Sequence, residues 1–181
     1  MADVDSGHEA NEETFVHLRH KPVQSLPANS EMVLAVPQLR SNVNLSRIAR
    51  AAGCCGIKKI LVEGNAKIDP KIARDAANTI EFENRRSLRP ALQKEKQKGE
   101  FSLIGLEQTT HSQPIYEFEF PPKTLLVIGH ERNGITEDIL GLLDATVEIP
   151  VFGLPYSFNV ATATSIALYE YVRQQLQRQT D

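Results

Sequence analysis

The feature that most constrains the fold is a regular alternation of short apolar runs with segments of helical character. Apolar runs of strand length occupy residues 32–36, 59–62, 101–106, 124–128 and 145–149. Helices are expected between and after them, over residues 45–53, 70–78, 87–98, 136–143 and 157–177. Strands that alternate with helices usually pair in parallel and are covered on both faces. We therefore predict an α/β fold with a mostly parallel sheet flanked by helices.

The chain divides into a short acidic segment and one domain. Residues 1–30 lack apolar periodicity, and residues 1–13 contain five acidic side chains without Lys or Arg. We therefore expect an acidic, largely flexible tail over 1–30, followed by a domain over 31–181 that is large enough to bury its own core.

The sequence lacks the features of membrane-spanning, secreted, disulfide-rich and zinc-binding proteins. No apolar run approaches the roughly 18 residues that cross a bilayer, so no membrane association is expected. The first residues lack the basic and apolar regions of a secretory signal, and we predict a cytoplasmic protein. Cys54 and Cys55 are adjacent, which suits neither a disulfide framework nor a zinc site.

Several common catalytic signatures are missing. The sequence contains no G-x-x-x-x-G-K-[ST] phosphate loop and no G-x-S-x-G nucleophile turn. Its five histidines include no pair at i and i+4, so we expect no metal site.

One glycine pattern follows an expected strand and precedes an expected helix. Gly129 and Gly134 enclose Glu131, which stands where a dinucleotide-binding turn would have its second glycine. A carboxylate there would repel a phosphate, but it would accept a cation or a hydroxyl group. The pattern therefore points away from NAD and towards a ligand such as the sulfonium of S-adenosylmethionine.

Three ordered segments carry a family resemblance. Residues 44–53, 125–135 and 149–163 resemble the three motifs of the SpoU (TrmH-like) branch of the SPOUT RNA methyltransferases, and the order and spacing match from about residue 31 to 173. The resemblance implies a carboxyl-terminal trefoil knot and a homodimer whose interface completes the site. It also implies S-adenosyl-L-methionine as methyl donor and a ribose 2'-hydroxyl of structured RNA, either tRNA or rRNA and not DNA, as acceptor.

The resemblance assigns catalytic roles to four residues: Arg50, Asn44, Glu131 and Asn159. Arg50 would act on the 2'-oxygen. Its position opposite the apolar stripe of its helix is also typical of a solvated arginine, and the motif is what favours the role on the acceptor. Because its pKa exceeds about 12, hydrogen bonding to the developing alkoxide is a better role than proton removal. Asn44 is alternatively a helix cap, and Glu131 is expected to brace Arg50, Arg132 or the loop.

The donor would be cradled by residues of the second and third motifs: Gly129, Ile149, Leu154, Ser157, Phe158 and Asn159. Ser157 is alternatively the N-cap of the last helix. Phe158 stands where leucine is common in the family, which changes the size of the side chain but not its polarity.

RNA contacts would come from Arg50, Arg85, Arg86, Arg89 and Lys94, with the cluster Arg19, His20 and Lys21 as a further candidate. The run from Arg85 to Lys98 contains six basic residues and the single acid Glu95. Such a run neutralises phosphates or simply forms a solvated helix face.

Two other functions remain open at this level. One is a noncatalytic RNA-binding or assembly protein on the same fold, and the other is methylation of a base or another acceptor. The presence of Arg50, Glu131, Ser157 and Asn159 at their motif positions argues for catalysis.

Overall fold

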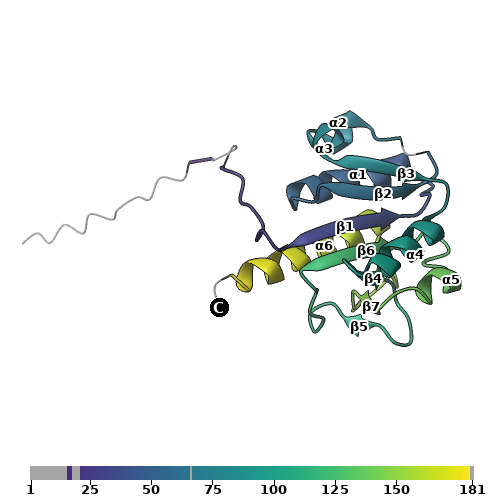
Figure 1. The fold of residues 1–181 in the computed structure, drawn as a ribbon. Coiled ribbons are helices and arrows are strands. Elements are labelled where there is room, and N and C mark those ends of the chain that lie inside the picture. The colour runs from purple at the N-terminus through teal and green to yellow at the C-terminus, as the bar shows by residue number, and fades with distance from the viewer. Residues whose placement is uncertain (1–15, 18–20, 66, 180–181) are drawn as a thin grey trace, which may run out of the picture.

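The computed structural model describes residues 16–17, 21–65 and 67–179 (Figure 1). In this part of the chain seven strands form one sheet in the order β3-β2-β1-β6-β4-β7-β5, and every neighbouring pair is parallel. Their bounds are β1 Glu31–Val36, β2 Lys59–Glu63, β3 Glu81–Arg85, β4 Ser102–Leu106, β5 Gln113–Pro114, β6 Lys123–Ile128 and β7 Ala145–Glu148. The predicted α/β class with a parallel sheet is confirmed.

Helices cover both faces of this sheet (Figure 1). Their bounds are α1 Asn42–Cys54, α2 Pro70–Ala73, α3 Ala76–Thr79, α4 Leu88–Lys98, α5 Glu137–Leu140 and α6 Val160–Gln177. Most buried apolar residues of α1 and α6 belong to one hydrophobic cluster, and the buried residues of α4 belong to a second cluster against which α5 packs. The domain therefore has three layers, as a parallel sheet requires for burial of both its faces.

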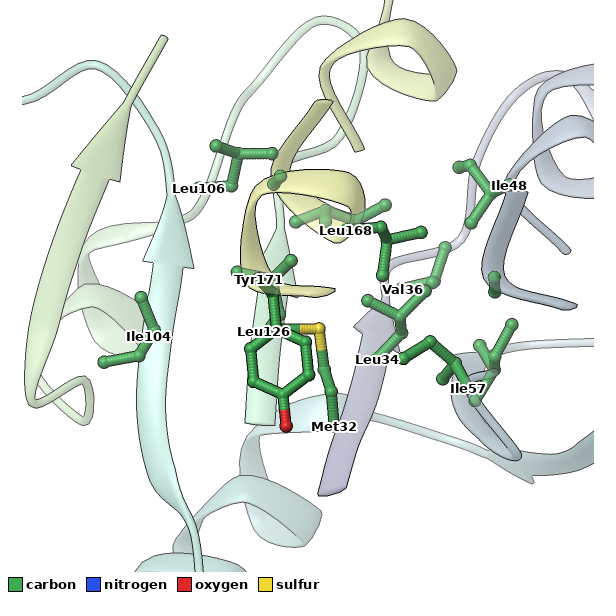
Figure 2. Packing of buried hydrophobic residues seen from close by; sticks show 14 of the residues in the cluster. Met32, Leu34, Val36, Ile48, Ile57, Ile104, Leu106, Leu126, Leu168 and Tyr171 are labelled. Atoms are coloured by element: carbon green, nitrogen blue, oxygen red, sulfur yellow. The ribbon is translucent and has the colours of Figure 1, made fainter. Parts of the chain in front are cut away.

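The alternation of side chains along β1 explains how the sheet separates these layers. Leu34 and Val36 contribute to the α1/α6 cluster, whereas Val33 and Ala35 contribute to the α4/α5 cluster. Figure 2 shows Leu168 and Tyr171 of α6 against Met32, Leu34 and Leu126 of the central strands. Both faces of the central strands are buried, so the strands are continuous apolar runs in the sequence.

Two strands were not predicted. β3 has the sequence Glu-Phe-Glu-Asn-Arg and lies at one edge of the sheet, paired only with β2 among the described strands. β5 is a two-residue strand at the opposite edge. Because edge strands are partly solvated, their side chains lack the apolar run by which the central strands are recognised.

Four expected helices differ in extent from the structure by more than one residue. The helix expected over 45–53 begins earlier, at Asn42. The helix expected over 70–78 is two short helices, α2 and α3, because Arg74 has a φ of 57° and interrupts the backbone hydrogen bonds. Asp69 caps α2 and Pro70 begins it, as predicted. α5 ends at Leu140 and not at Leu143. α6 begins at Val160, so the expected start at Ser157 was wrong.

The end of α6 is tied to the segment that leads into β6. The Tyr171 hydroxyl donates a hydrogen bond to the Pro122 carbonyl, and Gln174 both donates to the Phe118 carbonyl and accepts from the Phe120 amide, each at 2.8 Å. These polar contacts satisfy backbone groups that the helix covers. They fix the position of α6 on the sheet, and thereby the position of its first residue beside the strand ends.

Other expectations remain predictions. The trefoil knot and the division at residue 30 rest on the resemblance and on composition, and Arg19 and His20 lie outside the described residues. In the described part of the chain, no helix is long and apolar enough to cross a membrane.

Candidate functional site

A cavity of about 530 Å³ opens at the carboxyl ends of β4, β6 and β7. Ligands of open α/β sheets generally bind at this edge. Its walls come from the ends of the three strands, the segment before α6 and the first turn of α6. The lining residues are Leu106, Glu107, Gln108, Ile128, Gly129, His130, Glu131, Arg132, Gly134, Glu148, Ile149, Pro155, Ser157, Phe158, Asn159, Val160 and Ala163.

The second and third sequence motifs meet at this cavity. Five of the six residues expected to hold the donor line it, namely Gly129, Ile149, Ser157, Phe158 and Asn159. Leu154 is outside the lining, with 77% of its surface exposed. The roles of these six residues toward a donor remain a prediction, but five of the six line the same cavity.

The loop after β6 is closed by backbone hydrogen bonds. The amides of His130 and Gly134 each donate to the other residue's carbonyl at 3.0 Å. Inside this small ring, His130 Nδ1 accepts from the Arg132 amide at 3.2 Å. The loop therefore presents Gly129, His130 and Glu131 to the cavity in a fixed conformation.

Asn44, Glu131 and Asn159 form a hydrogen-bonded chain that joins the three motifs. Asn159 Nδ2 donates to Asn44 Oδ1 at 3.3 Å, and Asn44 Nδ2 donates to Glu131 Oε1 at 3.2 Å. Glu131 Oε2 also accepts from the Arg40 amide at 3.1 Å. Glu131 therefore contacts Asn44 and the Arg40 backbone. Among the described residues no hydrogen bond or ion pair joins Glu131 to Arg50 or Arg132, so the two arginines expected from the sequence as its partners are not the ones it binds.

The environment of Glu131 favours its charged form. Partial burial raises the pKa of Glu131, but hydrogen bonds from the Arg40 amide and the Asn44 side chain lower it, and the net shift is downward. A negative charge therefore lies at the cavity wall at neutral pH.

Two helix caps differ from the alternatives considered from sequence. Ser41 caps α1 by accepting from the Asn44 amide, so the Asn44 side chain is free to bind Glu131. Asn159 caps α6 by accepting from the Ala161 amide at 2.9 Å, and Ser157 lies in the preceding loop. Asn159 therefore uses its oxygen as a cap and its nitrogen to bind Asn44.

Arg50 lies on α1 but outside the cavity lining. Its side chain is exposed, on the side of α1 opposite the buried Ile48 and Ala52. The orientation expected from the helical pattern is confirmed, whereas its role in catalysis remains a prediction.

The expected RNA-binding cations are exposed but not equivalent. Arg85 ends β3 and forms an ion pair with Glu83, and Arg89 of α4 pairs with Asp138 at 3.3 Å. Arg86 and Lys94 are exposed as well, and no ion pair of either is observed within the described residues. The basic run is therefore partly neutralised by acids of neighbouring elements.

Glu107 is a cavity residue that sequence reasoning missed. It directly follows β4, and its Oε2 accepts a hydrogen bond from the Ile135 amide at 2.8 Å. Its position after a predicted strand was the signal that could have identified it, since the carboxyl ends of parallel strands share one edge.

Among the described residues, no three His, Cys, Asp or Glu side chains group so as to hold a metal ion.

Comparison with known proteins identifies the family. The sequence profile described as the SpoU rRNA Methylase family matches residues 31–169, which include all three motifs. The chain belongs to this SpoU family. The resemblance inferred from the motifs is thereby confirmed.

Two curated relatives match parts of this chain. A mouse protein named tRNA (guanosine(18)-2'-O)-methyltransferase TARBP1 is 42% identical over 85 residues, which are 47% of this chain and 5% of that protein. A Saccharomyces cerevisiae protein named tRNA (guanosine(18)-2'-O)-methyltransferase is 29% identical over 170 residues, which are 91% of this chain and 12% of that protein. The chain thus spans a small part of the length of both relatives.

A solved SpoU structure has the same fold. The SpoU methyltransferase AviRb from Streptomyces viridochromogenes, solved in complex with the cofactor AdoMet, aligns with a TM-score of 0.70 and 27% identity. The alignment covers 82% of this chain and 62% of that one. The parallel α/β architecture is therefore that of the SpoU family.

Proposed function

We propose that this protein transfers a methyl group from S-adenosyl-L-methionine to a ribose 2'-hydroxyl of tRNA or rRNA. The observation that carries the proposal is the meeting of the second and third SpoU motifs at one cavity, with Asn44 of the first motif hydrogen-bonded to its wall. The names of the two relatives make the ribose of a guanosine in tRNA the first acceptor to test.

The cavity fits a donor of this kind in size and charge. Its volume of about 530 Å³ lies within the range of roughly 300–1,000 Å³ that is typical of small-molecule sites. Three carboxylates line it, those of Glu107, Glu131 and Glu148, against one guanidinium, that of Arg132. This balance favours a positively charged sulfonium over a phosphate, while Ile149 and Phe158 offer apolar contact to a base.

When bound, the donor would supply an electrophilic methyl group, whose transfer to oxygen would break the carbon–sulfur bond and leave a neutral thioether, with the 2'-hydroxyl proton passing to solvent. Arg50 would donate hydrogen bonds to the 2'-oxygen as negative charge develops there. The residues that line the cavity would hold the donor and orient it toward that oxygen, and this alignment would supply much of the acceleration.

We further propose that the protein is a homodimer in which Arg50 acts in the cavity of the partner subunit. Two observations support this. First, Arg50 does not line the cavity of its own chain. Second, the segment beside the cavity contains three apolar residues with most of their surface exposed: 92% for Phe152, 77% for Leu154 and 81% for Tyr156. Neighbouring apolar side chains with such exposure are typical of an interaction surface.

The proposed location is the cytoplasm, as expected from the sequence. Cys54 and Cys55 are both free thiols, which suits a reducing compartment. Burial, with a further contribution from Cys54, raises the pKa of Cys55 to about 11, so this thiol is protonated and unreactive at neutral pH.

The test of the function is a calorimetric titration with S-adenosylmethionine, followed by transfer of a labelled methyl group to separate tRNA and rRNA fractions. We expect donor binding with one site per chain and incorporation that mass spectrometry identifies as a 2'-O-methylnucleoside. A modified base would contradict the proposed acceptor. RNA binding without donor binding or incorporation would instead support the noncatalytic alternative.

Sedimentation tests the dimer, and a mixing experiment tests the shared site. Arg50→Ala retains an intact cavity but should not transfer the methyl group. Gly129→Ala retains Arg50 but places a Cβ 2.8 Å from Glu107 Oε2 and 3.0 Å from Gly134 Cα, and we expect it to lose donor binding and activity. If sites are shared, an equal mixture of the two inactive variants regains about a quarter of the wild-type activity, because half of the dimers are mixed and each has one complete site. An inactive mixture of folded dimers, or a monomer at micromolar concentration, would contradict the shared site.

A further inference from the structure

Glu107 lines the cavity but belongs to none of the three motifs. Its amide donates to the Val147 carbonyl at 3.0 Å, which continues the pairing of β4 with β7 by one residue. This backbone bond holds Glu107 at the carboxyl edge of the sheet, and the residue lines the cavity.

Both oxygens of the Glu107 carboxylate accept hydrogen bonds from the backbone. Oε2 accepts from the Ile135 amide at 2.8 Å, and Oε1 accepts from the Gln108 amide at 3.0 Å. Ile135 is buried, with 7% of its surface exposed. Without Glu107, the partly buried Ile135 amide would lose the acceptor that it has in this structure.

The glycines of the second motif leave room for this carboxylate. A Cβ at Gly129 would lie 2.8 Å from Glu107 Oε2, and a Cβ at Gly134 would overlap the same oxygen. Gly134 also has a φ of +61°, a left-handed conformation that favours glycine. The glycine pattern noted in the sequence is thus explained by the close approach of the carboxylate of Glu107, the residue after β4.

We propose that Glu107 is a positioning residue for the methyl donor, and this role rests on the proposed function. The carboxylate lies against Gly129 and Gly134 and accepts from Ile135, so it contacts the loop at both ends. It thereby holds the loop in the conformation in which Gly129, His130 and Glu131 line the cavity. Loss of this contact releases one wall of the donor site while the sheet remains intact.

Glu63 provides a matched control for a purely structural role. It ends β2 as Glu107 follows β4, and its carboxylate accepts from the Leu88 amide at 3.3 Å and from the Gln38 amide at 3.5 Å. Glu63 does not line the cavity. Replacing either glutamate removes a carboxylate from a strand end and leaves a backbone amide without its acceptor.

The experiment compares Glu107→Ala, Glu107→Gln and Glu63→Ala by calorimetry with S-adenosylmethionine. We expect Glu107→Ala to raise the donor Kd about tenfold or more, while Glu63→Ala leaves it within about twofold although Tm falls in both. Glu107→Gln retains an oxygen that can accept from the Ile135 amide, and it should recover most of the donor affinity. Binding of bulk tRNA should be the same in all three variants.

Hydrogen exchange of the loop amides separates this proposal from the proposed function. Glu107→Ala should speed exchange at Ile135 and within residues 129–134 relative to wild type, and Glu63→Ala should not. An unchanged donor Kd or unchanged loop exchange in folded Glu107→Ala would overturn the positioning role, as would an equal loss of donor affinity in Glu63→Ala. Absence of donor binding in the wild-type protein would overturn the proposed function, and the exchange data would then decide alone whether Glu107 fixes the loop.

Discussion

Asn159 and Asn44 are 115 residues apart in the chain, and their side chains are joined by a hydrogen bond of 3.3 Å from Asn159 Nδ2 to Asn44 Oδ1. The same Asn159 side chain caps α6 through its oxygen. The start of α6 and the start of α1 are therefore held together by one amide group, and Asn44 extends the connection to Glu131 at the cavity wall.

The two functions of Asn159 can be separated by substitution. Asn159→Ala removes both, and it should lower the free energy of unfolding by about 1 kcal/mol for the cap alone. Asn159→Asp keeps an oxygen for the Ala161 amide but sets a carboxylate against Asn44 Oδ1, so it should retain the cap and lose the contact. Urea denaturation measures the loss of the cap, and titration with S-adenosylmethionine measures the effect of losing the contact with Asn44. Equal destabilisation by the two substitutions would contradict the assignment of the cap.

Glu131 predicts an acid-dependent loss of stability. Because its pKa is lowered in the folded state, the charged carboxylate stabilises the protein fully above its ordinary pKa of 4.5, and this contribution disappears as the pH falls through the folded pKa. Glu131→Gln should therefore lower the free energy of unfolding by about 1 kcal/mol at pH 7. The difference from wild type should shrink below about pH 4.5. Urea denaturation of wild type and Glu131→Gln across this pH range measures the difference in free energy of unfolding. A difference that stays the same at every pH would contradict the prediction.

Arg50 predicts a loss of methyl transfer without a loss of donor binding. Arg50→Ala should reduce the transfer rate by at least about a hundredfold, because it removes the donor of hydrogen bonds to the developing oxyanion. Arg47 is an exposed arginine on the same helix, and Arg47→Ala provides the control with the same change in charge. Single-turnover methylation and donor calorimetry measure the two effects. Full activity of Arg50→Ala would remove its proposed role.

The unequal pairing of the basic residues predicts unequal contributions to RNA binding. Arg86→Ala and Lys94→Ala should each weaken RNA binding and reduce the slope of log K against log salt by about one. Lys98 is already paired with Glu95 at 2.8 Å, so Lys98→Ala should have a smaller effect. Filter binding of bulk tRNA at several salt concentrations measures these slopes. Equal slopes for wild type and all three variants would assign the run to a solvated helix face.

The central part of the fold was accessible from sequence because its strands are buried on both faces. Continuous apolar runs such as that of β1 are a direct consequence of this burial. The edge strands β3 and β5 were missed for the converse reason, since a half-solvated strand such as Glu81–Arg85 needs few apolar residues. The break between α2 and α3 was missed because it depends on the single left-handed residue Arg74.

The sequence alone determined the α/β class, the three motifs and the family they indicate. Only the tertiary structure decided that Asn44 binds Glu131 and Asn159 and that Asn159 caps α6. It also decided that the Glu107 carboxylate lies against Gly129 and Gly134. The physical reason is that periodicity reports which face of a local segment is buried. Contacts between segments far apart in the chain depend instead on the order of strands in the sheet, which brings the ends of β4, β6 and β7 to one edge.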